Sequence, residues 1–343
     1  MNHSDVLAAT NDAKKFESPI KSGRAKIVWS RAFIVGGVHL LALLAFVPWL
    51  FSWTGVALVA VGYYAFGVLG INLCFHRLLS HRSFKCPRWF EYLLSTLGVC
   101  CLQGPPGRWI ALHRIYHQYS DEEDDPHTPL VGFLWAHFEW ALTEDLKRSW
   151  VLTYDKYAPD MIRDRYYLWL ERGGTWLYVY AWHAVAFFAT GFAVGWLEPG
   201  GSAMAGLQFG ASLLVWGVLV RTVCVWHATW SVNSFTHLMG YRNYETSDSS
   251  RNSWFVSVVA NGEGWHNNHH ADQNAASAGH KWWEFDATFL FIRLFHSLGL
   301  AYDVVPVRIH SKRLCASPVI LPTKDAQCSV EDKLAKKEMR RAA

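Results

Sequence analysis

The chain has 343 residues, of which 51% are hydrophobic, 15% aromatic and 17% charged. Soluble domains carry about a quarter charged residues, so this composition favours a membrane protein. The net charge of +4, without a basic stripe among the aromatic residues, argues against a nucleic-acid partner, and the seven cysteines, none in a CxxC pair, argue against a disulfide framework or a zinc ribbon.

The chain begins with a polar segment, residues 1–30, which lacks the short apolar core of a cleaved signal peptide. Residues 31–309 form the expected membrane domain, and residues 310–343 form a charged tail. Short links at 51–55 and 198–204 predict two antiparallel helical hairpins. Four apolar stretches reach the length of about 20 residues that a helix needs to cross a bilayer: 32–51, 56–75, 176–197 and 205–226.

Basic residues indicate the orientation of these helices. Six Lys and Arg residues precede the first apolar stretch, whereas the two hairpin links contain neither. The positive-inside rule therefore predicts that both chain termini are cytosolic. Apolar runs at 92–102, 131–142 and 288–300 are too short to span and predict interfacial or capping helices. The expected fold is an all-α integral membrane protein with four transmembrane helices in two hairpins and a cytosolic helical cap.

Three histidine clusters follow or separate the apolar stretches. They read His76-Arg-Leu-Leu-Ser-His81, His113-Arg-Ile-Tyr-His117 and His266-Asn-Asn-His269-His270. On a helix, residues three and four apart share one face, so Tyr116 and the histidines of the second cluster can converge on one point, as can those of the third. Imidazole suits iron, copper and zinc. All three clusters fall on the predicted cytosolic side, so the cap is expected to hold a histidine-rich dinuclear metal site.

The first cluster has a different spacing, because five residues turn an α-helix by roughly 140°. His76 and His81 can face one another only if the helix unwinds at its cytosolic end, or they bind different metals. Only one Glu-x-x-His occurs in the clusters, from Glu263 to His266. A dinuclear centre here would therefore be bound mainly by imidazole rather than by carboxylates. The absence of HExxH argues against a zincin-type protease.

The remaining polar residues near these clusters allow structural as well as functional readings. The acidic run from Asp121 to Asp125 is a solvated face or orients ligand imidazoles. Arg221 is expected to extend to the cytosolic interface. His39 and His183 are expected to pack within apolar stretches, and His127 and His227 could support the ligands. Surface or packing roles are expected for His3, His137, His280, His296 and His310.

The histidine motifs resemble those of membrane fatty acyl desaturases of the stearoyl or Δ9 type. The resemblance runs from about Val56 to Val305 and includes Asn233-Ser-Phe-Thr-His237, Asp125-Pro-His127 and Gly299-Leu-Ala-Tyr-Asp303. The Asn-Asn form of the third cluster resembles bacterial members. The resemblance implies a fatty acyl desaturase that uses O₂ to insert a cis double bond, expected at Δ9. It also implies two irons (Fe) per chain, held by His76, His81, His113, His117, His237, His266, His269 and His270, with Asn233 binding through water.

The resemblance also implies partners and a substrate path. Trp109, Trp230 and Trp265 flank ligand positions and either wall an acyl tunnel or belong to an interfacial aromatic belt. The sequence has no His-Pro-Gly-Gly motif of cytochrome b5 and no cysteine spacing for an iron–sulfur cluster. The electrons are therefore expected from a separate donor, ferredoxin or cytochrome b5 with its reductase. The substrate is expected to be an acyl-CoA or an acyl-lipid within the membrane.

Two departures from the family pattern bear on the activity. Tyr116 stands where the second cluster of the family has a histidine; it could bind metal as phenolate, give way to water, or impair the site. Ala111 and Leu112 replace an Arg-Asp pair that faces the CoA head in acyl-CoA desaturases, which favours an acyl-lipid or carrier-linked substrate. We expect a desaturase; the alternatives are an acyl-chain hydroxylase on the same scaffold and a non-catalytic protein that binds lipid or metal.

Overall fold

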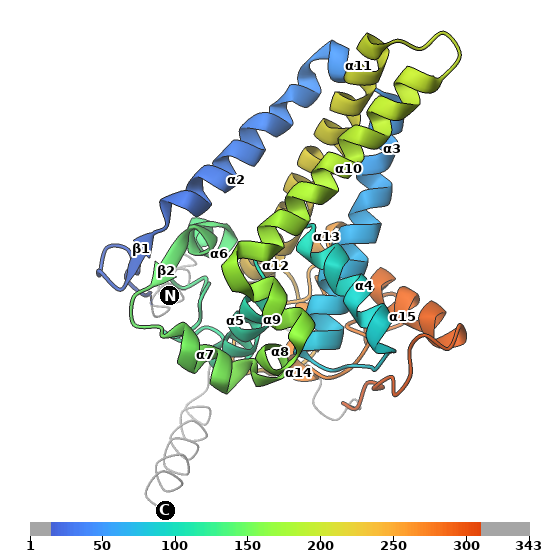
Figure 1. Cartoon of the computed structure of the whole chain (residues 1–343). Coiled ribbons are helices and arrows are strands. Elements are labelled where there is room, and N and C mark those ends of the chain that lie inside the picture. Colours follow the sequence, from blue (N-terminus) through green and yellow to red (C-terminus); the bar gives the residue numbers. More distant parts are fainter. Residues whose placement is uncertain (1–14, 310–343) are drawn as a thin grey trace, which may run out of the picture.

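The computed structural model describes residues 15–309. The charged tail and residues 1–14 of the polar N-terminal segment, including His3 and His310, lie outside the described residues. Figure 1 shows long helices that extend side by side from a block of shorter ones. Four stretches are long and apolar enough to cross a membrane, Trp29–Phe46, Trp53–Ser80, Arg165–Leu197 and Ala203–Leu238. The predicted helical class with four long apolar helices is therefore confirmed.

Each long stretch consists of several joined elements. The first contains α2 (Trp29–Ala42) and η1 (Leu43–Phe46), followed by η2 (Pro48–Leu50); the second contains α3 (Trp53–Gly62) and the π-helix η3 (Tyr63–Ser80). The third contains α9 (Arg165–Glu171), η5 (Arg172–Gly174) and α10 (Thr175–Leu197). The fourth contains α11 (Ala203–Leu214), the π-helix η6 (Val215–Val220) and α12 (Arg221–Leu238).

Shorter helices make up the rest of the described fold. They are α4 (Arg88–Val99), α5 (Pro106–Tyr119), α6 (Phe133–His137), η4 (Glu139–Leu142), α7 (Trp150–Tyr157), α8 (Pro159–Arg163), α13 (Trp254–Val259), α14 (His266–Ala271) and α15 (Ala287–Ser297). The all-α expectation omitted one small feature, an antiparallel ribbon of β1 (Ala25–Ile27) and β2 (Thr143–Asp145). Lys26 pairs with Glu144 in this ribbon, which ties the segment before α2 to the shorter helices.

Glycines allow close packing between α10 and α11. A Cβ atom on Gly191 would lie 2.8 Å from the Cα of Gly210, and one on Gly195 would lie 2.7 Å from the carbonyl oxygen of Ala205. Small residues spaced four apart let helix backbones approach in membranes, where apolar side chains gain nothing by leaving lipid. The chain enters α11 through Ser202, whose hydroxyl accepts a hydrogen bond from the Ala205 N–H.

The second long helix widens before it reaches the first histidine cluster. In a π-helix the N–H of residue i+5 bonds the carbonyl of residue i, and each turn takes about 4.4 residues. The His81 N–H accordingly donates to the His76 carbonyl at 3.1 Å, and the Ser80 hydroxyl donates to the Phe75 carbonyl at 2.7 Å. Five residues then turn by only about 50°. The helix therefore unwinds, which is one of the two predicted alternatives. As a result, the imidazoles of His76 and His81 point the same way.

Arg221 does not reach the interface, so that prediction was wrong. Its guanidinium is fully buried and donates to the carbonyls of Gly217 and Cys100, and it lies 2.8 Å from Nε2 of His183. These bonds replace the water that the charged group would otherwise seek. His183 also contacts the Tyr180 carbonyl through Nδ1, in agreement with its predicted packing role.

The fourth helix continues beyond its predicted end at residue 226. It extends to Leu238, and this extension carries Asn233 and His237. His227 lies in the same stretch but contacts His39 at 3.2 Å and His137 at 3.1 Å rather than any predicted ligand. This contact chain therefore gives His227 no direct role in the histidine clusters.

Candidate metal centre

All eight predicted histidine ligands lie together where η3, α5, α12 and α14 meet. They form two groups, and within each group the candidate ligand atoms lie within 4.8 Å of one another. We call them the five-histidine group (His76, His81, His113, His117 and His269) and the three-histidine group (His237, His266 and His270). The structure thus joins histidines separated by up to 194 positions in the sequence, from His76 to His270.

The five-histidine group is arranged around a shared point. The Nε2 atoms of His81 and His113 lie 2.8 Å apart, those of His113 and His117 lie 3.0 Å apart, and Nε2 of His269 lies 3.1 Å from those of both His76 and His117. Metal–imidazole bonds of 2.0–2.1 Å at right angles place neighbouring nitrogens about 3 Å apart. The nitrogens therefore fit the edges of a metal coordination sphere.

Four imidazoles of this group are held in the neutral form that binds metals. Burial, followed by the charges of neighbouring histidines, lowers the pKa of His81, His113, His117 and His269 well below the usual value. A neutral imidazole keeps a lone pair on one nitrogen. Lone pairs that face each other repel unless a cation or a proton lies between them, so this donor set fits a metal ion.

The hydroxyl of Tyr116 lies at the centre of the three-histidine group. Its oxygen is 2.7 Å from Nε2 of His237, 2.7 Å from Nε2 of His266 and 2.9 Å from Nε2 of His270. Burial, together with Asp125, raises the pKa of the phenol well above its ordinary value. Without a cation the phenol is therefore protonated, and one O–H can donate to only one of the three nitrogens.

Carboxylates help to orient the imidazoles around the Tyr116 oxygen. Nδ1 of His270 contacts Asp248 at 2.6 Å, and Nδ1 of His237 contacts Asp121 at 3.2 Å. Asp248 accepts the Nδ1–H of His270, which leaves Nε2 of His270 with a lone pair directed toward the Tyr116 oxygen. Nδ1 of His237 also lies 3.2 Å from the Ser249 hydroxyl, which donates to Asp121 at 2.6 Å. A cation bound by the three nitrogens and the phenolate oxygen would satisfy the whole set.

A third carboxylate serves the five-histidine group. Glu263 accepts from Nδ1 of His76 at 2.7 Å and from Arg77 at 2.7 Å, and Arg77 also pairs with Asp286 at 2.8 Å. Burial acts to raise the pKa of Glu263, but Arg77 and His76 lower it to about 2. The carboxylate therefore stays ionised although it is buried.

Some of these carboxylates were predicted from the sequence. The acidic run was expected to orient imidazoles or to be solvated; Asp121 contacts His237, and Asp125 lies 3.4 Å from His127. Asp248 was missed, because it lies 22 positions before its partner His270 in an irregular segment. The one available signal for Glu263 was its position three residues before His266.

A cleft of about 420 Å³ adjoins both histidine groups, and its lining includes Asn233, Trp109, His76 and Tyr116. Trp109 stacks on His113 with ring centroids 5.1 Å apart, and its indole N–H donates to Gln103 at 3.1 Å. Gln103 in turn donates to Thr229 at 2.9 Å, and sequence analysis had not singled out either residue. This cleft is the place where a substrate chain can approach the candidate ligands.

The other two predicted substrate tryptophans lie elsewhere. Trp230 stacks with Trp226, with ring centroids 5.6 Å apart, and lines a separate groove beside α2. The indole N–H of Trp265 donates to the Phe285 carbonyl at 2.8 Å, and its ring lies 6.5 Å from that of Tyr241. The structure therefore brings only Trp109 to the cleft beside the histidines.

The fatty acid desaturase family matches residues 49–303 of the chain. The chain is 39% identical over 289 residues to the sn-2 palmitoyl-lipid 9-desaturase of Nostoc sp., covering 84% of this chain and 94% of that protein. It is 39% identical over 283 residues to the sn-1 stearoyl-lipid 9-desaturase of Anabaena variabilis, covering 82% and 96%. It is also 36% identical to the icosanoyl-CoA 5-desaturase of Limnanthes douglasii, covering 89% and 83%.

Proposed function

The chain belongs to the fatty acid desaturase family and is an oxidoreductase that acts on fatty acyl chains, and we propose that it is an acyl-lipid Δ9-desaturase. In the proposed reaction, O₂, two electrons and two protons convert a –CH₂–CH₂– unit of an acyl chain into a cis double bond and yield two water molecules. The alternatives of a hydroxylase and of a non-catalytic binding protein are not favoured, because the relatives are desaturases.

The observation that carries this proposal is the convergence of two groups of imidazoles beside a cleft between long apolar helices. Two groups, each suited to one cation, support a di-iron site of two irons per chain. The proposed ligands are the eight histidines, with Tyr116 in the three-histidine group. Asn233, which lines the cleft, is proposed to bind through water.

The bound irons would supply the redox chemistry that activates O₂. The residues of the chain bind and orient the irons. The buried imidazoles would bind through Nε2, while Glu263 and Asp248 accept the opposite N–H of His76 and His270 and hold these rings in position; Ser249 connects His237 to Asp121. Trp109, stacked on His113, lies at the boundary between the ligands and the cleft and would position the alkyl chain.

Two observations support a lipid-linked substrate rather than acyl-CoA. Ala111 and Leu112 are apolar where the resemblance leads one to expect an Arg-Asp pair facing CoA. The relatives with 39% identity are described as acting on palmitoyl-lipid and stearoyl-lipid. We propose further that a separate ferredoxin, or cytochrome b5 with its reductase, supplies the electrons, and that the histidine clusters face the cytosol.

Expression of the full chain in a host that lacks its own Δ9-desaturase tests this proposal. Mass spectrometry of the membrane lipids, with cleavage at the double bond, should show new monounsaturated chains with the double bond at carbon 9. The purified protein should contain about two irons. A host that gains no double bond, although the chain is in the membrane and contains iron, would show that the proposed activity is wrong.

A further inference from the structure

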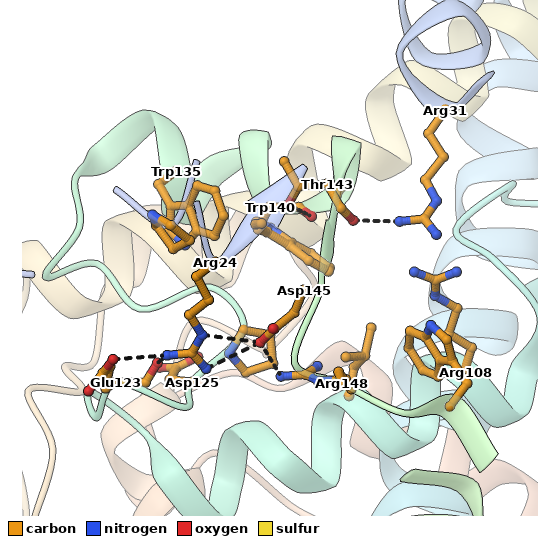
Figure 2. Close-up of a pocket in the computed structure, with 16 residues that line it drawn as sticks. Arg24, Arg31, Arg108, Glu123, Asp125, Trp135, Trp140, Thr143, Asp145 and Arg148 are labelled. Carbon is orange, nitrogen blue, oxygen red and sulfur yellow. Dashed lines mark hydrogen bonds and ion pairs between the residues drawn. The ribbon is translucent and has the colours of Figure 1, made fainter. Parts of the chain in front are cut away.

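A second cleft, of about 570 Å³, lies between the start of α2, α5 and the ribbon strand β2. Figure 2 shows that arginines from three different segments point into it. We call it the arginine cleft, after Arg24, Arg31, Arg108 and Arg148. None of these residues belongs to the histidine groups. Leu112, which directly precedes His113 on α5, also lines the cleft.

Of these four arginines, Arg24 is the one that hydrogen-bonds to carboxylates. Arg24 lies 2.8 Å from Asp124, 3.2 Å from Asp145 and 3.4 Å from Glu123. Arg148 lies 3.8 Å from the same Asp145. The Arg24 charge is therefore neutralised within the protein, whereas Arg148 has one carboxylate contact, as distant as that of Arg31 to Glu144.

The other two arginines face each other. In Figure 2 the guanidinium groups of Arg31 and Arg108 point toward one another across the cleft. Arg31 donates to the Thr143 carbonyl at 2.5 Å, and its closest carboxylate contact is Glu144 at 3.8 Å. Within the described part of the chain, the Arg108 guanidinium makes no hydrogen bond or ion pair and lies over the Trp150 ring at 4.2 Å. Burial and the neighbouring Arg31 charge lower the pKa of Arg108 to about 10.

The carboxylates that could neutralise Arg108 are engaged by other donors. Glu144 accepts from the indole N–H of Trp150 at 2.9 Å. Glu171 accepts from the N–H of Gly107 and from the hydroxyl of Tyr154, each at 2.6 Å. The guanidinium groups of Arg31 and Arg108 repel one another, because the nearby carboxylates neutralise so little of their positive charge. An anion placed between them would relieve that repulsion and fill the fork of donors that each presents.

The same two arginines also border an apolar groove of about 1030 Å³. Its lining includes Ile34 and Val35 of α2, Trp226 and Trp230 of α12, and Gln103, whose hydrogen bonds to Trp109 and Thr229 connect it to the cleft beside the histidines. Arg31 is the third residue of the first apolar helix, which is the depth at which lipid phosphates lie if that helix spans the bilayer. A charged end and a hydrocarbon groove at one site match an amphiphilic ligand.

We propose that Arg31 and Arg108 together bind the phosphodiester of a glycerophospholipid whose acyl chain lies in the adjoining groove. This inference rests on the proposed function and specifies its substrate class. One phosphodiester carries one negative charge, which suits two facing cations whose neighbour Arg24 is already paired with carboxylates. Coenzyme A carries several phosphates and would need more open cations, and a galactolipid carries none.

The test compares two lipids with identical distearoyl chains, phosphatidylglycerol and monogalactosyldiacylglycerol. The full-length, iron-loaded chain in a non-ionic detergent receives each lipid with ferredoxin, its reductase and O₂. Arg31→Gln and Arg108→Gln should each raise the KM for phosphatidylglycerol by about tenfold or more, because a charge-assisted contact to phosphate is lost. Their kcat should stay within about twofold, and the KM for the galactolipid should not change. The KM of Arg108→Lys for phosphatidylglycerol should fall between those of the wild type and Arg108→Gln, because lysine keeps the charge but lacks the paired N–H donors of a guanidinium group.

Arg24→Gln is the matched control, because it removes an arginine of the same cleft whose charge is already neutralised by Glu123, Asp124 and Asp145; it should leave both KM values unchanged. Equal effects of Arg108→Gln on both lipids, or turnover of stearoyl-CoA alone, would overturn the inference. Native mass spectrometry provides a readout that needs no turnover: the wild type should retain phosphatidylglycerol, and Arg108→Gln should lose it. If the wild type shows no desaturation and this binding difference still appears, the proposed function fails and the phosphate site stands. Equal retention of phosphatidylglycerol by the wild type and Arg108→Gln overturns the phosphate site.

Discussion

Tyr116 takes the central position in the three-histidine group, where its oxygen faces three imidazole nitrogens within hydrogen-bond distance. A phenol has one proton and can donate it to only one of these nitrogens. Tyrosine is a known iron ligand as phenolate. The contacts of Tyr116 therefore favour the first of the three outcomes considered from the sequence, a phenolate ligand, over an impaired site.

Replacement of the Tyr116 oxygen tests that role. Tyr116→Phe should lower the iron content from about two toward one per chain and reduce desaturation by about 10–100-fold or more. Tyr116→His should restore two irons, because an imidazole replaces the oxygen donor. In the ferric form, the wild type alone should show the visible absorption band of a phenolate bound to iron. Retention of two irons and full activity by Tyr116→Phe would show that the hydroxyl only packs.

Glu263 has a role that depends on two partners, His76 and Arg77. Glu263→Gln keeps the size of the side chain but removes the charge, so His76 loses its charged orienting acceptor, and Arg77 keeps Asp286 as its carboxylate partner. We expect iron affinity to fall by about 10–100-fold. Glu122→Gln, at an exposed carboxylate of the acidic run, is the control and should behave as the wild type. Iron titration with a competing chelator measures both; equal affinities would rule out the orienting role.

At the level of elements, the π-helix η3 explains how the first histidine cluster works. An α-helix would separate His76 and His81 by roughly 140°, whereas η3 lets the His81 ring lie with its centroid 4.8 Å from that of His76. Hydropathy gives the approximate position of this helix but not its wider turn, because the turn depends on tertiary contacts. One such contact is the approach of Gly70 to Gly98 of α4.

Gly70→Ala should disrupt this approach. A Cβ atom at position 70 would lie 2.3 Å from the backbone nitrogen of Gly98, so η3 and α4 would have to separate. We expect a loss of about 1–3 kcal/mol in the free energy of unfolding, together with lower iron content. Gly36→Ala in α2 is the matched control, because a Cβ atom there has nothing within 4 Å. It should be neutral or slightly stabilising, since alanine favours helix by up to about 1 kcal/mol. Equal thermal stability of the two variants would contradict this packing argument.

Asp160 connects α8 to α5 through Arg114, with contacts of 2.8 and 2.9 Å. Burial acts to raise the pKa of Asp160, but Arg114 and Arg82 lower it to about 2. Because the folded-state pKa lies below the ordinary value, the ion pair stabilises the fold above pH 4 and stops doing so as the pH falls toward 2. Asp160→Asn should therefore lower stability by about 2 kcal/mol at pH 7, and the difference from wild type should shrink between pH 4 and pH 2. A difference that is constant over this range would contradict the assigned role.

At the scale of the whole molecule, the lengths of the apolar stretches predicted four long helices, the spacing within the clusters predicted that histidines converge, and the resemblance to desaturases added His237 to the ligand set. Features that depend on distant partners could not be predicted in the same way. Arg221 was expected at the interface, yet Cys100 and His183 provide buried partners for it. Asp248 had no motif to mark it, and the arginine cleft is formed by α2, α5 and β2, which are far apart in the sequence. Such placements follow from tertiary packing and from the need to pair buried polar groups.

We propose above all that this chain desaturates lipid-linked acyl chains at a di-iron site held by histidines. The most direct measurement uses the purified, iron-loaded chain with distearoyl-phosphatidylglycerol, ferredoxin, its reductase and O₂, and locates any product double bond by mass spectrometry. We predict oleoyl chains with the double bond at carbon 9, formed only when iron and the electron donor are present. Hydroxylated chains in place of the olefin, or no product from a protein that holds two irons, would contradict the claim.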